Sequence, residues 1–263
     1  MARKSIGGSF LDWLIPPRTL KLNKDTQLLK LIAMLAMLID HLGAVVFPQY
    51  RFMRIIGRMA FPLYAYCLVA GCIYTKDILR YIERIALLLL VSQPLYVVVM
   101  NHMSGSMYAV SFAESPVHAA FNFYLESFHD PSILFTLLIG LILLWSIRDR
   151  KFIITACVGI FLYFTYRIMD YSWRGIVLML LLYLFSSRPI LSMPLVTAFM
   201  IWWGMQGNGY SFMGISFGIQ MFAIFALPLI YIPTNSRIKL PKFVFYLFYP
   251  AHLLLVWGAK ILF

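Results

Sequence analysis

LLKLIAMLAMLIDHLGAVVFP, residues 28–48, is an apolar run long enough to cross a lipid bilayer as a helix, for which about 20 residues are needed. The run nevertheless contains Lys30 near its start and the neighbours Asp40 and His41 in its second half. Ionisable side chains at membrane depth are costly, by roughly 2.5–3.5 kcal/mol on insertion scales, and they usually serve a function. The stretch therefore predicts a membrane protein whose first helix carries part of a functional site.

The composition extends this prediction to the whole chain. Of the 263 residues, 62% are hydrophobic and 12% are charged, whereas a soluble domain is about 45–50% apolar and about 25% charged. These values predict an all-α, polytopic membrane protein and argue against a soluble domain. Cys67, Cys72 and Cys157 all lie in apolar runs, which predicts small buried side chains rather than disulfides or a metal site.

Nine apolar runs are candidates for membrane spans. They lie at 28–48, 55–74, 85–100, 132–147, 152–169, 175–185, 189–204, 214–232 and 243–263. Because some are short for a full crossing, we predict about nine spans, with eight to ten as the range. In the eighth run, Gly214 and Gly218 are predicted to allow close packing of helices. The chain is thus divided into a cytoplasmic or interfacial N-terminal segment, 1–27, and a single transmembrane bundle, 28–263.

The distribution of positive charge indicates membrane orientation rather than nucleic-acid binding. The net charge is +12, but with a cytoplasmic N-terminus 16 of the 22 lysines and arginines fall in predicted inner segments, and the predicted outer segment 101–131 has none. Cytoplasmic loops of membrane proteins carry such an excess of positive charge. We therefore predict a cytoplasmic N-terminus and no nucleic-acid partner. Segment 101–131 is expected to be a solvated loop or a short surface helix rather than a lid over a substrate.

Helical spacing places Lys30, Met34, Met37 and His41 along one face of the first predicted helix. At about 1.5 Å per residue, Lys30 and His41 are separated by roughly 16 Å along the axis. A base at one end of this face and an imidazole at the other would suit a long, thin, anionic ligand. The alternative is a lysine that extends to the interface next to ordinary methionine packing, and the spacing leaves both open.

Asp40 is expected to pair with a cation on another helix. The side chains of consecutive helical residues point about 100° apart, so a direct hydrogen bond between the side chains of Asp40 and His41 is disfavoured. Arg54 and Arg58 share one face at the start of the second predicted helix, and Arg58 projects deeper. Buried ion pairs stabilise weakly compared with apolar packing, which favours a functional role, although a purely structural pair stays open.

The last predicted span adds a second intramembrane histidine. Tyr249 and His252 are three residues apart on one face, around Pro250. Proline-kinked helices can expose backbone groups to a cavity. A single histidine could merely donate to a neighbouring carbonyl, but two histidines at a depth similar to that of Asp40 and the arginines indicate a shared pocket.

Five stretches together resemble the TraX family, in the family's order. They are LKLIAMLAMLIDH (29–41), RIIGRMAFPLYAY (54–66), ILFTLLIGL (133–141), DYSWRGIVLMLLLYLF (170–185) and FYLFYPAHLLL (245–255). TraX of F-like conjugation systems acetylates the N-terminus of the pilin subunit, and the family is grouped with membrane acyltransferases. The relatives commonly place a basic residue eleven positions before a histidine in the first helix. Lys30 and His41 have this interval, with lysine where arginine is usual.

The resemblance implies a multi-pass acetyltransferase of the bacterial cytoplasmic membrane. Acetyl-CoA from the cytoplasm is the expected acyl donor. The expected acceptor is extracytoplasmic: a pilin-like protein, an envelope peptide or a glycan. Membrane lipid is expected as a further partner of the protein. No metal is expected.

The resemblance also assigns roles to the buried polar residues. The expected catalytic residues are His41, Asp40 and His252, with His41 as a general base or a transient acyl carrier. The expected binding residues are Lys30, Arg58, Arg54 and Tyr249. Lys30 would meet the donor phosphates, and Asp40 with Arg58 would hold two helices in register. Tyr249 and His252 would position the acceptor or donate to the developing oxyanion.

Two functions of other classes stay open on the residues alone. A proton-coupled transporter could use the same intramembrane Asp, His and Arg cluster, and it would move substrate without an acyl donor. A scaffold subunit of an envelope complex would tolerate loss of His41 as long as the bundle stayed folded.

Overall fold

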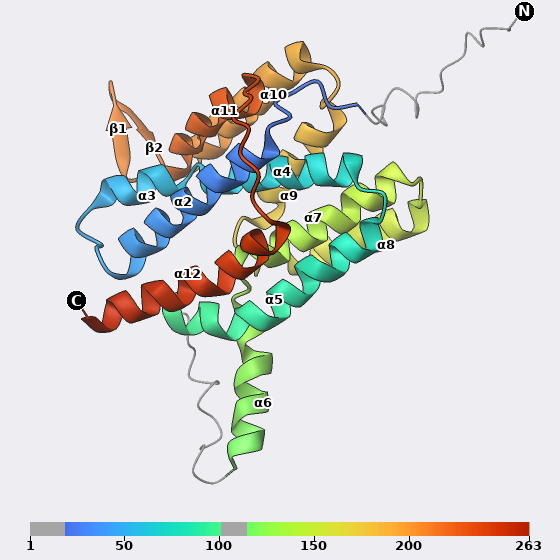
Figure 1. Cartoon of the computed structure of the whole chain (residues 1–263). Helices are drawn as coiled ribbons and strands as arrows, with labels where there is room; N and C mark the ends of the chain where they lie inside the picture. Colours follow the sequence, from blue (N-terminus) through green and yellow to red (C-terminus); the bar gives the residue numbers. More distant parts are fainter. Residues whose placement is uncertain (1–18, 101–114, 263) are drawn as a thin grey trace, which may run out of the picture.

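The structure, a computed structural model, describes residues 19–100 and 115–262, and in these ranges every regular element but one short hairpin is helical (Figure 1). The predicted all-α class is confirmed in this described part. The elements are α2 (Thr26–Val45), α3 (Arg51–Gly57), α4 (Ala60–Tyr74), α5 (Ile78–Met100), α6 (Pro116–Glu126), the 3-10 helix η2 (Ser127–His129), α7 (Ile133–Arg148), α8 (Phe152–Thr165), α9 (Ser172–Leu184), α10 (Pro189–Met205), the strands β1 (Tyr210–Phe212) and β2 (Ile215–Phe217), the 3-10 helix η3 (Ile219–Ala226), α11 (Leu227–Tyr231) and α12 (Lys242–Leu262).

The lengths and composition of the helices are those of a membrane protein. Within the described ranges, four helical segments are long and apolar enough to cross a bilayer: Thr26–Val45, Arg51–Tyr74, Ile78–Met100 and Phe243–Leu262. The helical segment Pro116–His129 and helix α7 meet at an angle of 65°, and together they form a fifth candidate if the bent pair counts as one span. The apolar helices from α8 to α11 are shorter. Each predicted run contains a helical element, but nine spans and a cytoplasmic N-terminus stay predictions.

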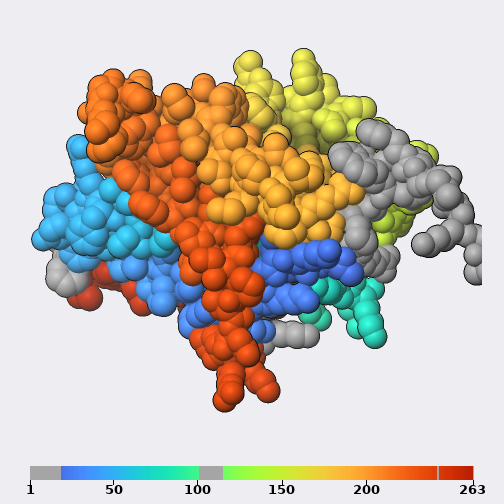
Figure 2. All heavy atoms as spheres, turned by 90° about the horizontal axis from the view of Figure 1, so that it is seen from above, coloured from blue at the N-terminus to red at the C-terminus, as the bar shows by residue number. Residues whose placement is uncertain are grey.

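Helix α2 is held at its start by a side-chain cap and by a neighbouring loop. The Asp25 carboxylate accepts hydrogen bonds from the backbone N–H of Leu28 and of Ser236, and an acidic N-cap of this kind stabilises a helix start. Burial alone would raise the pKa of the Asp25 carboxyl, but these hydrogen bonds outweigh it and lower the pKa below its ordinary value. The chain before α2 therefore lies beside the segment that follows α11, as Figure 2 shows in blue and dark orange.

Helix α2 is also the element around which the site is built. It packs against α3 and α4, and it contacts α12, which in turn packs against α5. Figure 1 shows α12, from the C-terminal end of the chain, running alongside α2 and α5. Residues near both ends of the sequence therefore meet inside one bundle.

The eighth predicted run begins as a β-hairpin and not as a helix. Tyr210 pairs with Phe217 in antiparallel register, and the two-residue loop is formed by Met213 and Gly214. Both loop residues have positive φ, of 49° and 81°, as tight hairpin turns require. The prediction of close helix packing is wrong for Gly214, which forms the turn. At Gly218, just before η3, there is a close approach, because a Cβ atom there would lie 2.8 Å from the Cα atom of Gly207, just after α10.

Two further predictions can be compared with the described residues. In the predicted outer segment 101–131, residues 101–114 lie outside the described part, and the rest includes the largely exposed helix α6, one of the two expected forms. Cys67 and Cys72 are buried as predicted, but Cys157 is exposed on α8, which buries none of its own residues. That prediction is wrong because apolar composition does not distinguish a protein-facing side chain from a lipid-facing one.

Candidate functional site

The two predicted intramembrane histidines are in direct contact. His41 on α2 and His252 on α12 are both buried, and His41 Nδ1 lies 2.9 Å from His252 Nε2. Their ring centroids are 5.0 Å apart, with an angle of 26° between the ring planes. The other nitrogen of His252, Nδ1, lies 3.1 Å from the carbonyl oxygen of Phe248, one helical turn earlier. Two predicted catalytic residues, 211 positions apart in the chain, thus form one hydrogen-bonded pair.

Asp40 forms ion pairs with both predicted arginines. Arg58 Nη2 lies 2.7 and 2.8 Å from the two carboxylate oxygens of Asp40, and Arg54 Nη1 lies 2.7 Å from Oδ2. The side chains of Asp40 and Arg58 are 11% and 12% exposed, whereas that of Arg54 is 31% exposed. The expected pairing with Arg58 is confirmed geometrically, and Arg54 supplies a second donor. The pairs join α2 to the helices that follow it.

A glycine makes room for the Asp40 carboxylate. A Cβ atom placed on Gly57, the last residue of α3, would overlap the carboxylate of Asp40. The Asp40 side chain could not easily rotate away from such a Cβ atom, because two arginines hold its carboxylate in place. Gly57 is therefore needed for close approach and not for an unusual backbone conformation.

Substitution of this glycine should loosen the ion pairs. We expect Gly57→Ala to destabilise the protein by about 1–3 kcal/mol, the usual effect of overpacking a filled site. The matched control is Gly159→Ala in α8, where a Cβ meets nothing within 4 Å and the change should stay within about 1 kcal/mol. Thermal unfolding of both variants in the same detergent provides the measurement. Equal midpoints would show that Asp40 does not need this space.

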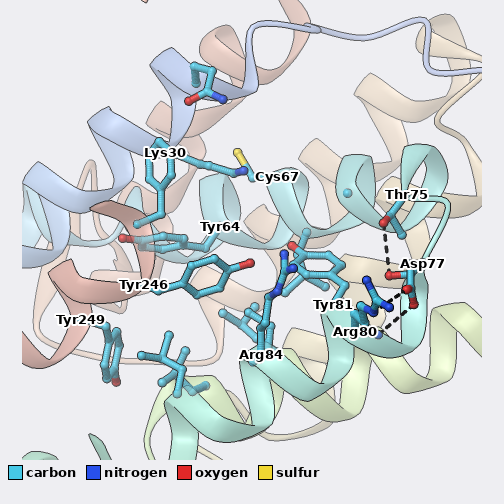
Figure 3. Close-up of a pocket in the computed structure, with 18 of the residues that line it drawn as sticks. Lys30, Tyr64, Cys67, Thr75, Asp77, Arg80, Tyr81, Arg84, Tyr246 and Tyr249 are labelled. Atoms are coloured by element: carbon cyan, nitrogen blue, oxygen red, sulfur yellow. Dashed lines mark hydrogen bonds and ion pairs between the residues drawn. The ribbon is translucent and has the colours of Figure 1, made fainter. Parts of the chain in front are cut away.

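A cavity of about 460 Å³ opens on another part of α2 (Figure 3). It is lined by α2, α4, α5, α7 and α12. Four basic side chains border it: Lys30, Lys76, Arg80 and Arg84. Four tyrosines also line it: Tyr64, Tyr81, Tyr246 and Tyr249. A cavity with cationic groups and with aromatic and aliphatic side chains in its lining suits a ligand that is anionic at one end and slender and less polar at the other.

Tyr249 belongs both to the cavity lining and to the surroundings of the histidine pair. In Figure 3, Arg80 and Asp77 lie at one side of the cavity and Tyr249 at the other. Tyr249 lines the cavity, and its ring lies 5.2 Å from the ring of His252. Its hydroxyl is buried without a hydrogen bond of normal geometry. Neither His41 nor His252 lines the cavity, so Tyr249 is a lining residue that links the cavity to the histidine pair by direct contact.

Lys30 lies at the cavity, where its ammonium is 5.1 Å from the centre of the Phe245 ring. The cavity does not follow the expected track from Lys30 along Met34 and Met37 to His41, because neither methionine is among its lining residues.

Several cavity residues were missed by sequence reasoning. Tyr64 and Tyr81 were not singled out, and Arg80 and Arg84 entered only as two of the 16 positive charges in predicted inner segments. The apolar run was taken to begin at residue 85, whereas α5 begins at Ile78 and carries these charges on its first turns. The spacing of Arg80 and Arg84, four apart and so on one helical face, was the available signal.

Comparison with known proteins gives one match over most of the chain. The TraX protein family matches residues 25–260, a range that includes all seven predicted site residues. The uncharacterized protein RP591 of Rickettsia prowazekii (strain Madrid E) is 49% identical over 45 residues. That alignment covers 17% of this chain and spans only 17% of the length of the curated relative. No solved structure matches the chain.

Proposed function

Because this chain belongs to the TraX family, we propose that it is an integral membrane acetyltransferase that moves an acetyl group from cytoplasmic acetyl-CoA to an extracytoplasmic acceptor. The observation that carries the proposal is that Tyr249 lines a cavity bordered by basic side chains and also contacts His252 of the buried His41–His252 pair. A donor site and a candidate base thus adjoin each other inside a membrane protein.

The cavity is the proposed site of the acyl donor. Its volume, about 460 Å³, lies in the range of small-ligand sites. Lys30, Arg80 and Arg84 would meet the phosphates, because cationic side chains form strong, charge-assisted bonds with phosphate oxygens. The pantetheine arm would lie against the tyrosines and bring the thioester toward Tyr249. With the N-terminus in the cytoplasm and nine spans, these basic residues belong to the cytoplasmic side.

The chemistry is assigned to the imidazole of His41. It removes a proton from the acceptor amine or hydroxyl as that atom attacks the thioester carbon. The carbon–sulfur bond breaks, and the departing thiolate takes the proton, which gives free CoA and an acetylated acceptor. In the second version of the mechanism, His41 itself carries the acetyl group briefly between donor and acceptor. Both versions require the thioester to come within reach of His41, which does not itself line the cavity.

The acceptor would approach from the outer side of a bacterial cytoplasmic membrane. The N-terminal amine of a pilin-like protein, an envelope peptide or a sugar hydroxyl or amine can each supply the nucleophile. Asp40, Arg54 and Arg58 hold α2 against α3 next to His41, and in this proposal the acceptor would bind on that side of the site.

The direct test uses the purified full chain in proteoliposomes with acetyl-CoA labelled in the acetyl group. Added envelope extract should become labelled, and free CoA thiol should appear in proportion. Vesicles without the protein set the background. Donor-independent uptake of solute, with neither product formed, would contradict the proposal and favour the transporter. Mass spectrometry of the labelled fraction then identifies the acceptor.

Removal of the Lys30 charge should weaken donor binding. We expect Lys30→Met to raise the KM for acetyl-CoA by about 10–100-fold with little change in kcat, because a charge-assisted hydrogen bond contributes about 1.5–3 kcal/mol. Methionine retains most of the packing against Phe245. Lys24→Met is the matched control, since Lys24 lies before α2 and does not line this cavity. A similar KM in both variants would remove Lys30 from the donor site.

A further inference from the structure

The hydrogen bonds of the histidine pair determine which nitrogen of each ring carries a proton. A carbonyl oxygen can only accept, so the contact between His252 Nδ1 and the Phe248 oxygen requires the proton on Nδ1. In a neutral ring the other nitrogen, His252 Nε2, is then an acceptor. Since it lies 2.9 Å from His41 Nδ1, that atom must be the donor. For a pair of neutral rings, His41 Nε2 is left with its lone pair.

We propose that His252 is a positioning residue that fixes the tautomer of His41, so that His41 Nε2 is the basic nitrogen that meets the acceptor. This inference rests on the proposed function for its catalytic consequence but not for its geometry. It replaces the sequence-based expectation that His252 itself contacts the acceptor. A histidine nitrogen is commonly selected in this way by the hydrogen bond that the other nitrogen makes.

The fold holds His252 tightly enough for this task. The side chain is almost fully buried, and its ring stacks on Phe248 with centroids 5.0 Å apart and an angle of 8°. Tyr249 contacts the same ring from a second side, at 73°. A ring fixed on two sides and hydrogen-bonded through both nitrogens has one orientation. The acceptor atom it offers to His41 is therefore fixed as well.

The proposed step follows from this arrangement. His41 Nε2 takes the proton of the acceptor group while the acceptor nitrogen or oxygen bonds to the thioester carbon. His41 becomes an imidazolium, and its Nδ1–H continues to donate to His252 Nε2. When the carbon–sulfur bond breaks, the departing thiolate of CoA takes from His41 Nε2 the proton that came from the acceptor. His252 neither gains nor loses a proton in the cycle.

Two substitutions separate the hydrogen bond from simple packing. His252→Gln can place an amide oxygen near the former Nε2 atom and still accept from His41 Nδ1. His252→Phe keeps an aromatic ring on Phe248 but accepts nothing. We expect kcat to fall by about 10²-fold or more in the phenylalanine variant, the usual scale of general-base catalysis, and by much less in the glutamine variant. The KM for acetyl-CoA should change little in either.

A spectroscopic measurement tests the tautomer without any reaction. Nitrogen-15 NMR of the full chain, labelled at histidine and free of donor, should show His41 with a protonated Nδ1 and an unprotonated Nε2, assigned with a His41→Gln sample. His252→Phe should lose this preference and His252→Gln should retain it. A His41 protonated at Nε2 in the unsubstituted protein, or equal kcat in the two variants, would overturn the proposal. The expected NMR result with no acetyl transfer would refute only the proposed function.

Discussion

Replacement of His41 by alanine is expected to reduce the rate of acetyl transfer by about 10²–10⁴-fold, the contribution of a positioned general base. The imidazole is buried and contacts His252, whose ring in turn contacts Tyr249 in the lining of the cavity assigned to the donor. The measurement is the single-turnover transfer of labelled acetyl groups in proteoliposomes at saturating acetyl-CoA. The KM for acetyl-CoA should stay near that of the unsubstituted protein, because His41 does not line the cavity.

The control for this experiment is a histidine elsewhere on the same chain. His118 lies exposed on α6, away from the described cavity, and His118→Ala should transfer acetyl groups at the unsubstituted rate. The thermal midpoint of each variant shows whether the bundle is still folded. Full transfer by folded His41→Ala would refute its catalytic role. Retention of every envelope function by that variant would support the scaffold interpretation.

The ion pairs of Asp40 could be predicted from sequence because an unpaired charge in a membrane is so unfavourable. Asp40 needed a cation, and Arg54 and Arg58 were the nearest candidates in the following helix. Helical spacing then placed both arginines on one face, and the structure has both bound to the carboxylate. The prediction was definite because the Asp40 charge strongly needed a cationic partner and few candidate cations were available.

The histidine pair was only partly predictable. Sequence position placed His41 and His252 at similar depth, but depth does not determine how a helix is rotated about its axis. The 2.9 Å contact depends on the packing of α12 against α2, which side chains from both helices decide together. No local pattern in either stretch specifies that a nitrogen of one ring faces a nitrogen of the other.

The cavity and the hairpin show two other limits of the sequence. The search for apolar runs excluded Arg80 and Arg84, because charges in the first turns of α5 lower its hydropathy although the helix continues through them. The hairpin around Met213 and Gly214 was not predicted for the opposite reason: its two strands are apolar enough to resemble part of a membrane span. Hydropathy records the surroundings of a segment better than its backbone conformation.

Removal of the Asp40 charge is expected to have the largest effect on stability. Asp40→Asn should destabilise the protein by about 3–5 kcal/mol, because it removes the carboxylate charge that forms an ion pair with the buried guanidinium of Arg58. Arg54 contributes less to this loss, since it is partly exposed and can be solvated. The matched control is Asp77→Asn, which disrupts an exposed ion pair with Arg80 and should cost less than about 1 kcal/mol. Unfolding by heat or denaturant in one detergent compares the two.

A double substitution separates stability from function at the same cluster. Replacement of a whole buried ion pair by apolar side chains is often neutral or stabilising, so Asp40→Leu combined with Arg58→Met should recover much of the stability that Asp40→Asn loses. If the cluster only joins α2 to α3, acetyl transfer should recover too. If it sets the polarity beside His41, the double variant should be stable but slow, and this is the result we expect. An Asp40→Asn protein as stable as Asp77→Asn would contradict the importance of the pair for the fold.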